Sequence, residues 1–257
     1  MVADNGQPGR LDLSAIILVG PRYPENIGAA ARIALNFGIA KLIVVAEEKP
    51  DQERMLKMAT HQAARLIHEM ELHRHTGDAV APFHFVVGTT ARRGRRRTLE
   101  QTPREVMGKV AALPAGQRIA LMFGPENTGL TNQDLDYCQL SSTIPTADFS
   151  SLNLAQAVAI HCYELAMAVN STRTAPLPKA DYANSYELEG MYAHIEQILT
   201  TTTYLGDYNR TLWMRNIRQF LSRVRIKKKE ACMIRGICRK LLWHAQESEK
   251  RRAGPEG

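Results

Sequence analysis

Short runs of apolar, β-branched residues alternate with segments of helical periodicity in the N-terminal part of the chain. The apolar runs have the length of buried strands and cover residues 15–19, 41–45, 83–87, 119–123 and 142–144. The helical patterns between and after them cover residues 27–37, 53–70, 103–113, 131–136 and 152–169. Strands that are apolar along their whole length and alternate with helices predict an α/β fold, in which a parallel sheet is covered by helices on both faces.

The pattern changes after residue 170. Two prolines among small polar residues interrupt residues 171–185, which we interpret as a linker. Helical periodicity then returns and predicts a small all-helical domain, with helices at residues 186–203, 209–224 and 229–245. The predicted organisation is therefore an α/β domain at 1–170, a linker at 171–185 and a helical domain at 186–257, of which residues 248–257 are expected to be disordered.

Composition narrows the class of protein. The chain has 257 residues, 44% of them hydrophobic, which is enough for a substantial core. The N-terminus is polar and lacks the features of a signal peptide, and no apolar run approaches the roughly 20 residues of a membrane span, so we expect a cytoplasmic protein with no membrane contact. The four cysteines form no C-x-x-C pair, so neither a metal site nor a disulfide framework is predicted.

Basic residues are concentrated in two places. Residues 210–252 contain 14 Lys or Arg against 3 Asp or Glu, while the whole chain carries a net charge of +7. A second cluster follows directly on a predicted strand and comprises Arg92, Arg93, Arg95, Arg96 and Arg97. A single charge run is often only a solvated surface. Two separate clusters favour nucleic acid as the partner.

Four segments at the ends of the predicted strands carry candidate chemistry. Neither the Gly-rich dinucleotide fingerprint nor the P-loop is present, so a ligand is expected at the loops that follow the strands. In the first, Asn26 is expected to cap a helix, and Gly28 leaves space for close approach on the same face as Arg32. The alternative is a small-residue packing face with a surface arginine. In the second, Thr89 offers a hydroxyl and Gly88 would let a planar ligand approach.

The other two segments combine turns with helix starts. Gly124 and Gly129 flank a Pro-Glu-Asn turn that is expected to be rigid, although ordinary turn chemistry explains the same residues. Ser150, Ser151 and Asn153 stand at the start of a helix, where free backbone N–H groups favour an electron-rich ligand group. Ser and Asn at this place are also ordinary N-caps.

Taken in order, these segments resemble the motifs of the SpoU/TrmH branch of the SPOUT RNA methyltransferases. The resemblance rests on Asn26-Ile-Gly-Ala-Ala-Ala-Arg32, Phe123-Gly-Pro-Glu-Asn-Thr-Gly-Leu130 and the segment 144–158, and it covers about residues 13–170. The segments 191–199 and 214–223 are similar to the helical tail of the TrmJ subgroup. The resemblance implies a deep trefoil knot in the C-terminal part of the sheet domain, S-adenosylmethionine as cofactor without a metal, and a homodimer that binds substrate across the subunit boundary. The reaction it implies is methylation of a ribose 2′-hydroxyl, in this subgroup on a pyrimidine of the tRNA anticodon loop.

The resemblance also assigns roles to residues. Arg32 would be the catalytic arginine, Ser151 its partner near the ribose, and Asn26 and Glu126 would support the active site. The cofactor pocket would be lined by Thr89, Thr90, Gly124, Pro125, Ile144, Ser151, Leu152 and Asn153. The arginines of segment 92–97 would grip the RNA. Two roles stay open for Arg32, transient general base or electrostatic stabiliser of the forming alkoxide; we favour the second because a guanidinium is not deprotonated at ordinary pH.

Two alternative functions remain at this point. One is a ribosomal RNA 2′-O-methyltransferase, since only the helical tail favours tRNA. The other is a catalytically silent RNA-binding module on the same fold, against which the intact set of Asn26, Arg32, Glu126 and Ser151 argues. Phe149 stands where some related chains would have tyrosine, which leaves cytidine or uridine preference open.

Overall fold

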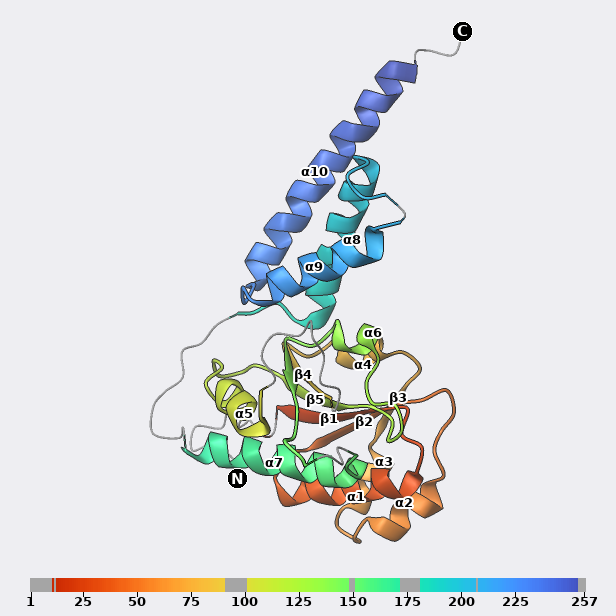
Figure 1. The fold of residues 1–257 in the computed structure, drawn as a ribbon, viewed down its shortest axis with the longest axis vertical. Helices are drawn as coiled ribbons and strands as arrows, with labels where there is room; N and C mark the ends of the chain where they lie inside the picture. The colour runs from red at the N-terminus through yellow and green to blue at the C-terminus, as the bar shows by residue number, and fades with distance from the viewer. Residues whose placement is uncertain are drawn as a thin grey trace. The chain divides into compact units, whose positions relative to one another are not determined.

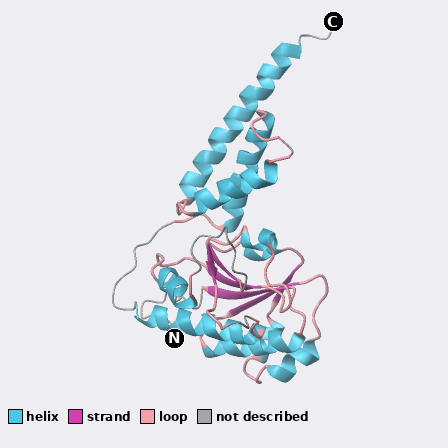
Figure 2. Ribbon diagram, viewed as in Figure 1, coloured by secondary structure: helices cyan, strands magenta, loops and turns pink. Residues whose placement is uncertain are grey.

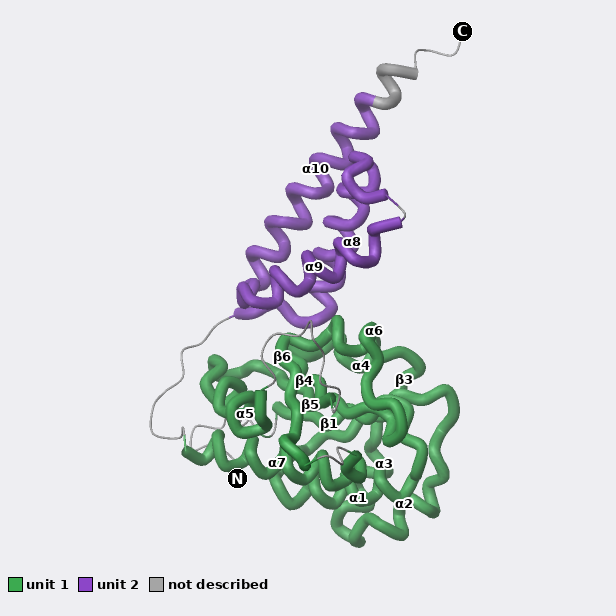
Figure 3. Tube along the Cα trace, in the orientation of Figure 1, with its two compact units in different colours: residues 1–180 green, residues 181–257 purple. Residues whose placement is uncertain are grey.

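A computed structural model describes residues 11, 13–90, 101–147, 151–171, 181–206 and 208–253. The chain divides into two compact units, Met1–Ala180 and Asp181–Gly257 (Figure 3). Each unit is described separately below.

The first unit is built on a parallel sheet, drawn in magenta in Figure 2. Its strand order is β3-β2-β1-β5-β4-β6. The strands are β1 Ser14–Val19, β2 Lys41–Val45, β3 Glu71–His73, β4 Phe85–Thr89, β5 Ile119–Phe123 and β6 Leu140–Ser142. The predicted parallel α/β fold is confirmed. Strand β3 was not predicted, because three residues at the edge of the sheet, with Leu72 exposed, carry no apolar run.

Helices cover both faces of this sheet (Figure 1). One face packs against α1 Pro24–Asn36, α2 Gln52–Met58, α3 Ala64–His68, α5 Pro103–Ala111 and α7 Leu154–Ser171, and the other against the short helices α4 Thr76–Val80 and α6 Asn132–Leu135. Alternate residues of each strand serve the two faces, as Ile16 and Ile17 do in β1. This alternation explains why the strands are apolar along their whole length.

The helix predicted at residues 53–70 is wrong as a single element. Helix α2 ends at Met58, and α3 begins at Ala64. Between them the hydroxyl of Thr60 accepts a hydrogen bond from the backbone N–H of Ala63 at 3.4 Å, so a local side-chain contact competes with helix continuation.

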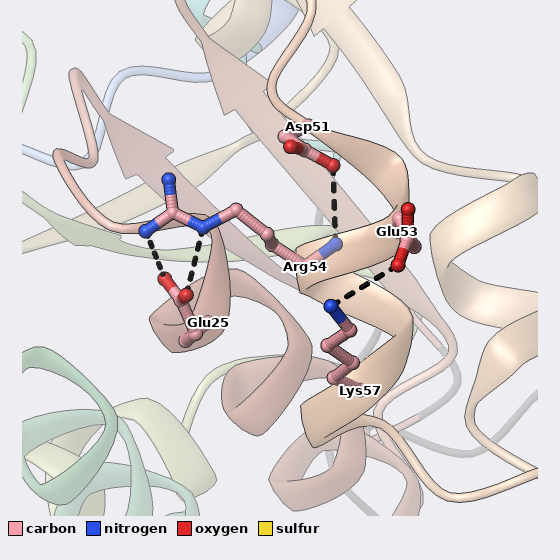
Figure 4. Close-up of polar contacts among 5 residues, drawn as sticks. All are labelled: Glu25, Asp51, Glu53, Arg54 and Lys57. Carbon is pink, nitrogen blue, oxygen red and sulfur yellow. Dashed lines mark hydrogen bonds and ion pairs between the residues drawn. The ribbon is translucent and has the colours of Figure 1, made fainter.

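Helix α2 packs closely against α1 at Gly28. A Cβ atom at that position would lie 1.9 Å from the carbonyl oxygen of Met55. Figure 4 shows the polar contacts that border this packing: Arg54 forms a two-point ion pair with Glu25 at 2.8 and 3.0 Å, and Asp51 caps α2. Hydrogen bonding to Arg54 lowers the pKa of Glu25. Gly28 in α1 therefore serves helix packing, which agrees with the alternative interpretation of this segment as a small-residue packing face.

One buried polar pair joins α7 to the end of β6. His161 and Ser142 are both fully buried, and the His161 Nε2 atom lies 2.9 Å from the Ser142 hydroxyl. The Nδ1 atom lies 2.8 Å from the Ala157 carbonyl, which can only accept, so Nδ1 carries the proton and Nε2 accepts from Ser142. Burial lowers the pKa of His161 to about 4.

The second unit consists of α8 Ser185–Thr201, α9 Arg210–Ser222 and α10 Lys228–Ala253. Helix α10 runs alongside α8 (Figure 1), and a small core forms around Met191, Tyr192 and Met214. Three helices were predicted here. The expectation that residues 248–257 are disordered is wrong for 248–253, which form the end of α10. Among the described residues of both units, no helix has the length and apolar character needed to cross a membrane.

Replacing Gly28 with alanine tests the packing of α1 on α2. We expect Gly28→Ala to lower the free energy of unfolding by about 2–4 kcal/mol, because the new Cβ would force the helices apart. Gly108→Ala in α5 is the matched control, since a Cβ there meets nothing within 4 Å; it should stabilise by about 0.5–1 kcal/mol. Urea denaturation measures both, and equal effects would contradict the packing argument.

The buried histidine predicts a pH dependence of stability. As the pH falls from 6.5 towards 4, His161 gains a proton in the unfolded chain but stays neutral in the folded protein. The free energy of unfolding should therefore drop, and His161 should account for about 3 kcal/mol of that drop. The reference is the double variant His161→Leu with Ser142→Ala, which removes the titrating group and leaves no unpaired hydroxyl. Denaturation midpoints measured across this range should diverge for the two proteins; parallel curves would refute the assignment.

Candidate active site

Side chains from three segments that follow the carboxyl ends of strands form one hydrogen-bonded chain. The amide nitrogen of Asn26 donates to Glu126 Oε1 at 2.6 Å, and the amide nitrogen of Asn153 donates to Asn26 Oδ1 at 3.0 Å. These residues follow β1, β5 and β6, and Asn26 lies 100 or more positions before each of its two partners. We call these three residues the polar triad.

The carboxylate of Glu126 fixes the direction of the polar triad. It can only accept when ionised, so Asn26 must turn its NH₂ group towards it and its oxygen towards Asn153. Asn153 must then donate with its own NH₂ group, which leaves its oxygen for the start of α7. That oxygen accepts from the backbone N–H of Ala155 at 2.9 Å, and Gln156 accepts from the N–H of Asn153 at 3.3 Å. Asn153 is therefore both a helix cap and a member of the site.

Asn26 itself does not cap a helix, so that expectation is wrong. Helix α1 begins at Pro24, with Tyr23 in the N-cap position, and Asn26 lies inside the first turn, buried to 9% exposure. Because proline fits the first helical turn, the helix starts before Asn26. The asparagine side chain is thus free to reach across to Glu126.

The loop after β5 is a tight turn that only glycine permits. A Cβ on Gly124 would lie 2.2 Å from the backbone nitrogen of Leu130, and Gly129 has a φ of 64°. The N–H of Gly129 donates to the Pro125 carbonyl at 2.8 Å. Both glycines therefore hold the loop in the shape that presents Glu126 to Asn26.

The loop after β4 is tied to its neighbours. The Thr89 hydroxyl donates to the Met122 carbonyl at 3.2 Å, and the Thr90 N–H donates to the Ser142 carbonyl at 3.0 Å. The expectation that a planar ligand approaches at Gly88 is wrong. A Cβ there would lie 2.6 Å from Cys138 Sγ, so side chains already fill that space.

The remaining candidates lie around the polar triad or outside the described residues. Ile144 and Leu152 are half-buried on either side of the segment 148–150. Arg32 and Ser151 are exposed, and neither side chain forms a hydrogen bond or ion pair with another described residue. Segment 92–97, the predicted RNA cluster, lies outside the residues that the structure describes.

Two contacts escaped the sequence analysis. The backbone N–H of Arg22 donates to Glu126 Oε2 at 2.9 Å, which occupies the second carboxylate oxygen. Gln156 completes a reciprocal cap with Asn153. The first contact cannot be predicted from residue types because its donor is a backbone N–H. The Asn-x-x-Gln spacing of Asn153 and Gln156 could have indicated the second contact.

The direction of the polar triad can be tested by reversing it. Asn153→Asp keeps the cap on α7 but sets a carboxylate against Asn26 Oδ1, and we expect it to cost about 1–2 kcal/mol of unfolding free energy. Combining it with Glu126→Gln lets Asn26 turn around, because the glutamine can donate where the glutamate could not. A double-mutant cycle by denaturation should therefore show a favourable coupling of about 1 kcal/mol. Additive losses would contradict the deduced direction.

Comparison with known proteins places these features in a family. The SpoU rRNA methylase family matches residues 14–163, and the C-terminal domain of the tRNA methyltransferase TrmJ matches residues 186–252. A relative from Pseudomonas aeruginosa, named tRNA (cytidine/uridine/adenosine-2′-O-)-methyltransferase TrmJ, is 33% identical over 244 residues, which are 88% of this chain and 93% of that protein. The tRNA (cytidine/uridine-2′-O-)-methyltransferase TrmJ of Sodalis glossinidius is 34% identical over 91% of this chain and 92% of its own.

Solved structures agree with the sequence comparison. The crystal structure of TrmJ from Z. mobilis superposes with a TM-score of 0.75 at 30% identity, covering 89% of this chain and 98% of that one. The three motifs that meet in the polar triad all lie within the matched family region. The chain therefore belongs to the SpoU rRNA methylase family and carries, in its second unit, the C-terminal domain of the TrmJ methyltransferases.

Proposed function

We propose that this chain is an S-adenosylmethionine-dependent methyltransferase that modifies a ribose 2′-hydroxyl in tRNA, on a pyrimidine of the anticodon loop. The observation that carries the proposal is the polar triad, which joins all three family motifs at one edge of the sheet. The match of the second unit to the TrmJ C-terminal domain favours tRNA over ribosomal RNA. Two relatives that match most of the chain are named tRNA 2′-O-methyltransferases, one for cytidine and uridine and the other for adenosine as well.

The ends of β4, β5 and β6 suit the proposed cofactor. These strands are neighbours in the order β5-β4-β6, so their loops share one edge. Half-buried Ile144 and Leu152 offer apolar contact for an adenine ring, and the turn at Gly124 and Pro125 brings backbone close, with Thr89 and Thr90 at the edge. The cofactor would supply an activated methyl group on a sulfonium sulfur, and the chain supplies position and charge.

Methyl transfer needs the ribose oxygen to attack in line with the bond from methyl carbon to sulfur while it loses its proton. Arg32 is exposed and has no ion pair with a described residue, so its guanidinium is available to an RNA phosphate and to the forming alkoxide. We assign it that electrostatic role, with Ser151 near the ribose. Asn26 and Glu126 act as positioning residues, because the polar triad fixes α1 relative to the other two loops.

A homodimer is part of the proposal. Leu35 on α1 and Tyr163 and Met167 on α7 are large apolar side chains that are 38%, 48% and 50% exposed. The two helices pack on each other, and the ring of Tyr163 contacts Phe37. A second copy covering this surface would remove it from water. The same proposal includes a deep knot in the first unit and a cytoplasmic location. It also assigns catalysis to residues 1–170 and RNA binding to residues 186–257 and to segment 92–97.

Replacing Arg32 tests the proposed chemistry. Arg32→Ala should reduce methyl incorporation from labelled S-adenosylmethionine into bulk tRNA by about 100-fold or more, while calorimetry shows nearly unchanged cofactor affinity. Arg74→Ala, another exposed arginine of the first unit, is the control for loss of charge and should keep full activity. If cofactor affinity collapsed in parallel, Arg32 would belong to the pocket instead.

The RNA product distinguishes the alternatives. Mass spectrometry of nucleosides from tRNA and ribosomal RNA treated with the wild-type protein should place the methyl group on a pyrimidine ribose of tRNA. Methylation confined to ribosomal RNA would support the other enzyme class, and no methylation of either RNA would support a silent binding module.

A further inference from the structure

Two groups of cations in the second unit differ in their ion pairing. One set is paired with the acidic side chains of α8: Arg210 lies 2.6 Å from Glu196, Arg218 forms a two-point ion pair with Glu189, and Lys228 lies 3.0 Å from Glu187. The hydrogen bond to Glu187 raises the pKa of Lys228. These pairs fasten α9 and α10 to α8, so they belong to the folding of the unit.

The other set is concentrated between α9 and α10. We call residues 222–229 the basic turn; it has the sequence Ser-Arg-Val-Arg-Ile-Lys-Lys-Lys and contains no acidic residue. Arg223, Arg225, Lys227 and Lys229 are all exposed, and none forms an ion pair with a described residue. The neighbouring Glu230 is occupied, because its Oε2 atom accepts from the Lys227 backbone N–H at 2.8 Å.

The backbone of the basic turn is held in place. Ile226 is buried in the core of the unit, and its carbonyl accepts from the N–H of Ala183 at 3.0 Å. The N–H of Lys228 donates to the carbonyl of Asp181 at 2.9 Å. The backbone that carries these cations is therefore tied to the rest of the unit at two points, and it presents their positive charge from a fixed place.

Apolar side chains lie next to this charge. Phe220, in the last turn of α9, is 64% exposed, and Val224 is 55% exposed. An exposed aromatic ring beside several cations suits a single-stranded nucleic acid, in which phosphates meet the charges and an unstacked base meets the ring. A second copy of the same surface would bring like charges together, which disfavours self-association there.

We propose that the basic turn is a phosphate-binding surface that holds the RNA backbone during methylation. The inference deepens the proposed function and rests on it for the identity of the RNA. The cations that pair with α8, Lys228 among them, are left out of the surface, so the proposed contact is made by Arg223, Arg225, Lys227 and Lys229 with the adjoining Phe220.

Two variants with equal loss of charge test this. In the first, Arg223, Arg225 and Lys229 are changed to glutamine; in the second, Lys250, Arg251 and Arg252 near the end of the chain are changed to glutamine. Binding of full-length protein to labelled tRNA, measured by fluorescence anisotropy at several KCl concentrations, should weaken about 10-fold or more for the first variant only. Its slope of log affinity against log salt should fall by about 2–3, one unit for each lost phosphate contact.

Further measurements separate the outcomes. Circular dichroism melting should show that both variants fold, and the turn variant should keep kcat at saturating tRNA while its KM for tRNA rises. Equal weakening by both triple variants would overturn the inference, as would vesicles of anionic lipid that bind the turn more tightly than tRNA does. If wild-type protein bound tRNA through the turn but methylated no RNA, the proposed function would fail and the surface would stand.

Discussion

The hydrogen-bonded chain from Glu126 through Asn26 to Asn153 is the interaction on which the candidate site depends. An ionised carboxylate at one end sets the orientation of both amides, and the last amide oxygen caps α7. Because Asn26 is buried, leaving its amide group unpaired would cost desolvation free energy. Loops that are distant in sequence are thereby held in one arrangement, which is the requirement for positioning a reacting hydroxyl.

The remainder of the first unit supports that arrangement. The parallel sheet brings the carboxyl ends of its strands to one edge, and glycines at 124 and 129 shape the loop that carries Glu126. Gly28 lets α2 pack closely on α1, and His161 ties α7 to the end of β6 through Ser142. These contacts fix α1, which carries Asn26, and they fix α7 and β6 on either side of Asn153. Arg32 and Ser151, in contrast, are exposed.

The second unit uses its charge in two ways. Acidic residues of α8 bind the cations that face them, and this pairing leaves a separate group of cations at the basic turn. The net charge of residues 210–252 does not distinguish one cation of this region from another. The pairing of particular side chains distinguishes the cations that stabilise the bundle from those that are available to a polyanion.

The sequence by itself determined the parallel α/β class, the helical second unit and the family, because apolar periodicity and contiguous motifs are local properties of the chain. It also indicated Asn26, Glu126 and Asn153 as candidate site residues, but it assigned Asn26 to a helix cap and Gly88 to ligand approach. Only the tertiary structure decided otherwise, since Pro24 starts α1 before Asn26, and Cys138 fills the space beside Gly88. Strand β3 was missed because its pairing with β2 at the edge of the sheet does not require an apolar run. The break at Thr60 was missed because a local side-chain hydrogen bond competes with helix continuation. Contacts between residues 100 or more positions apart are set by packing, and no local pattern encodes them.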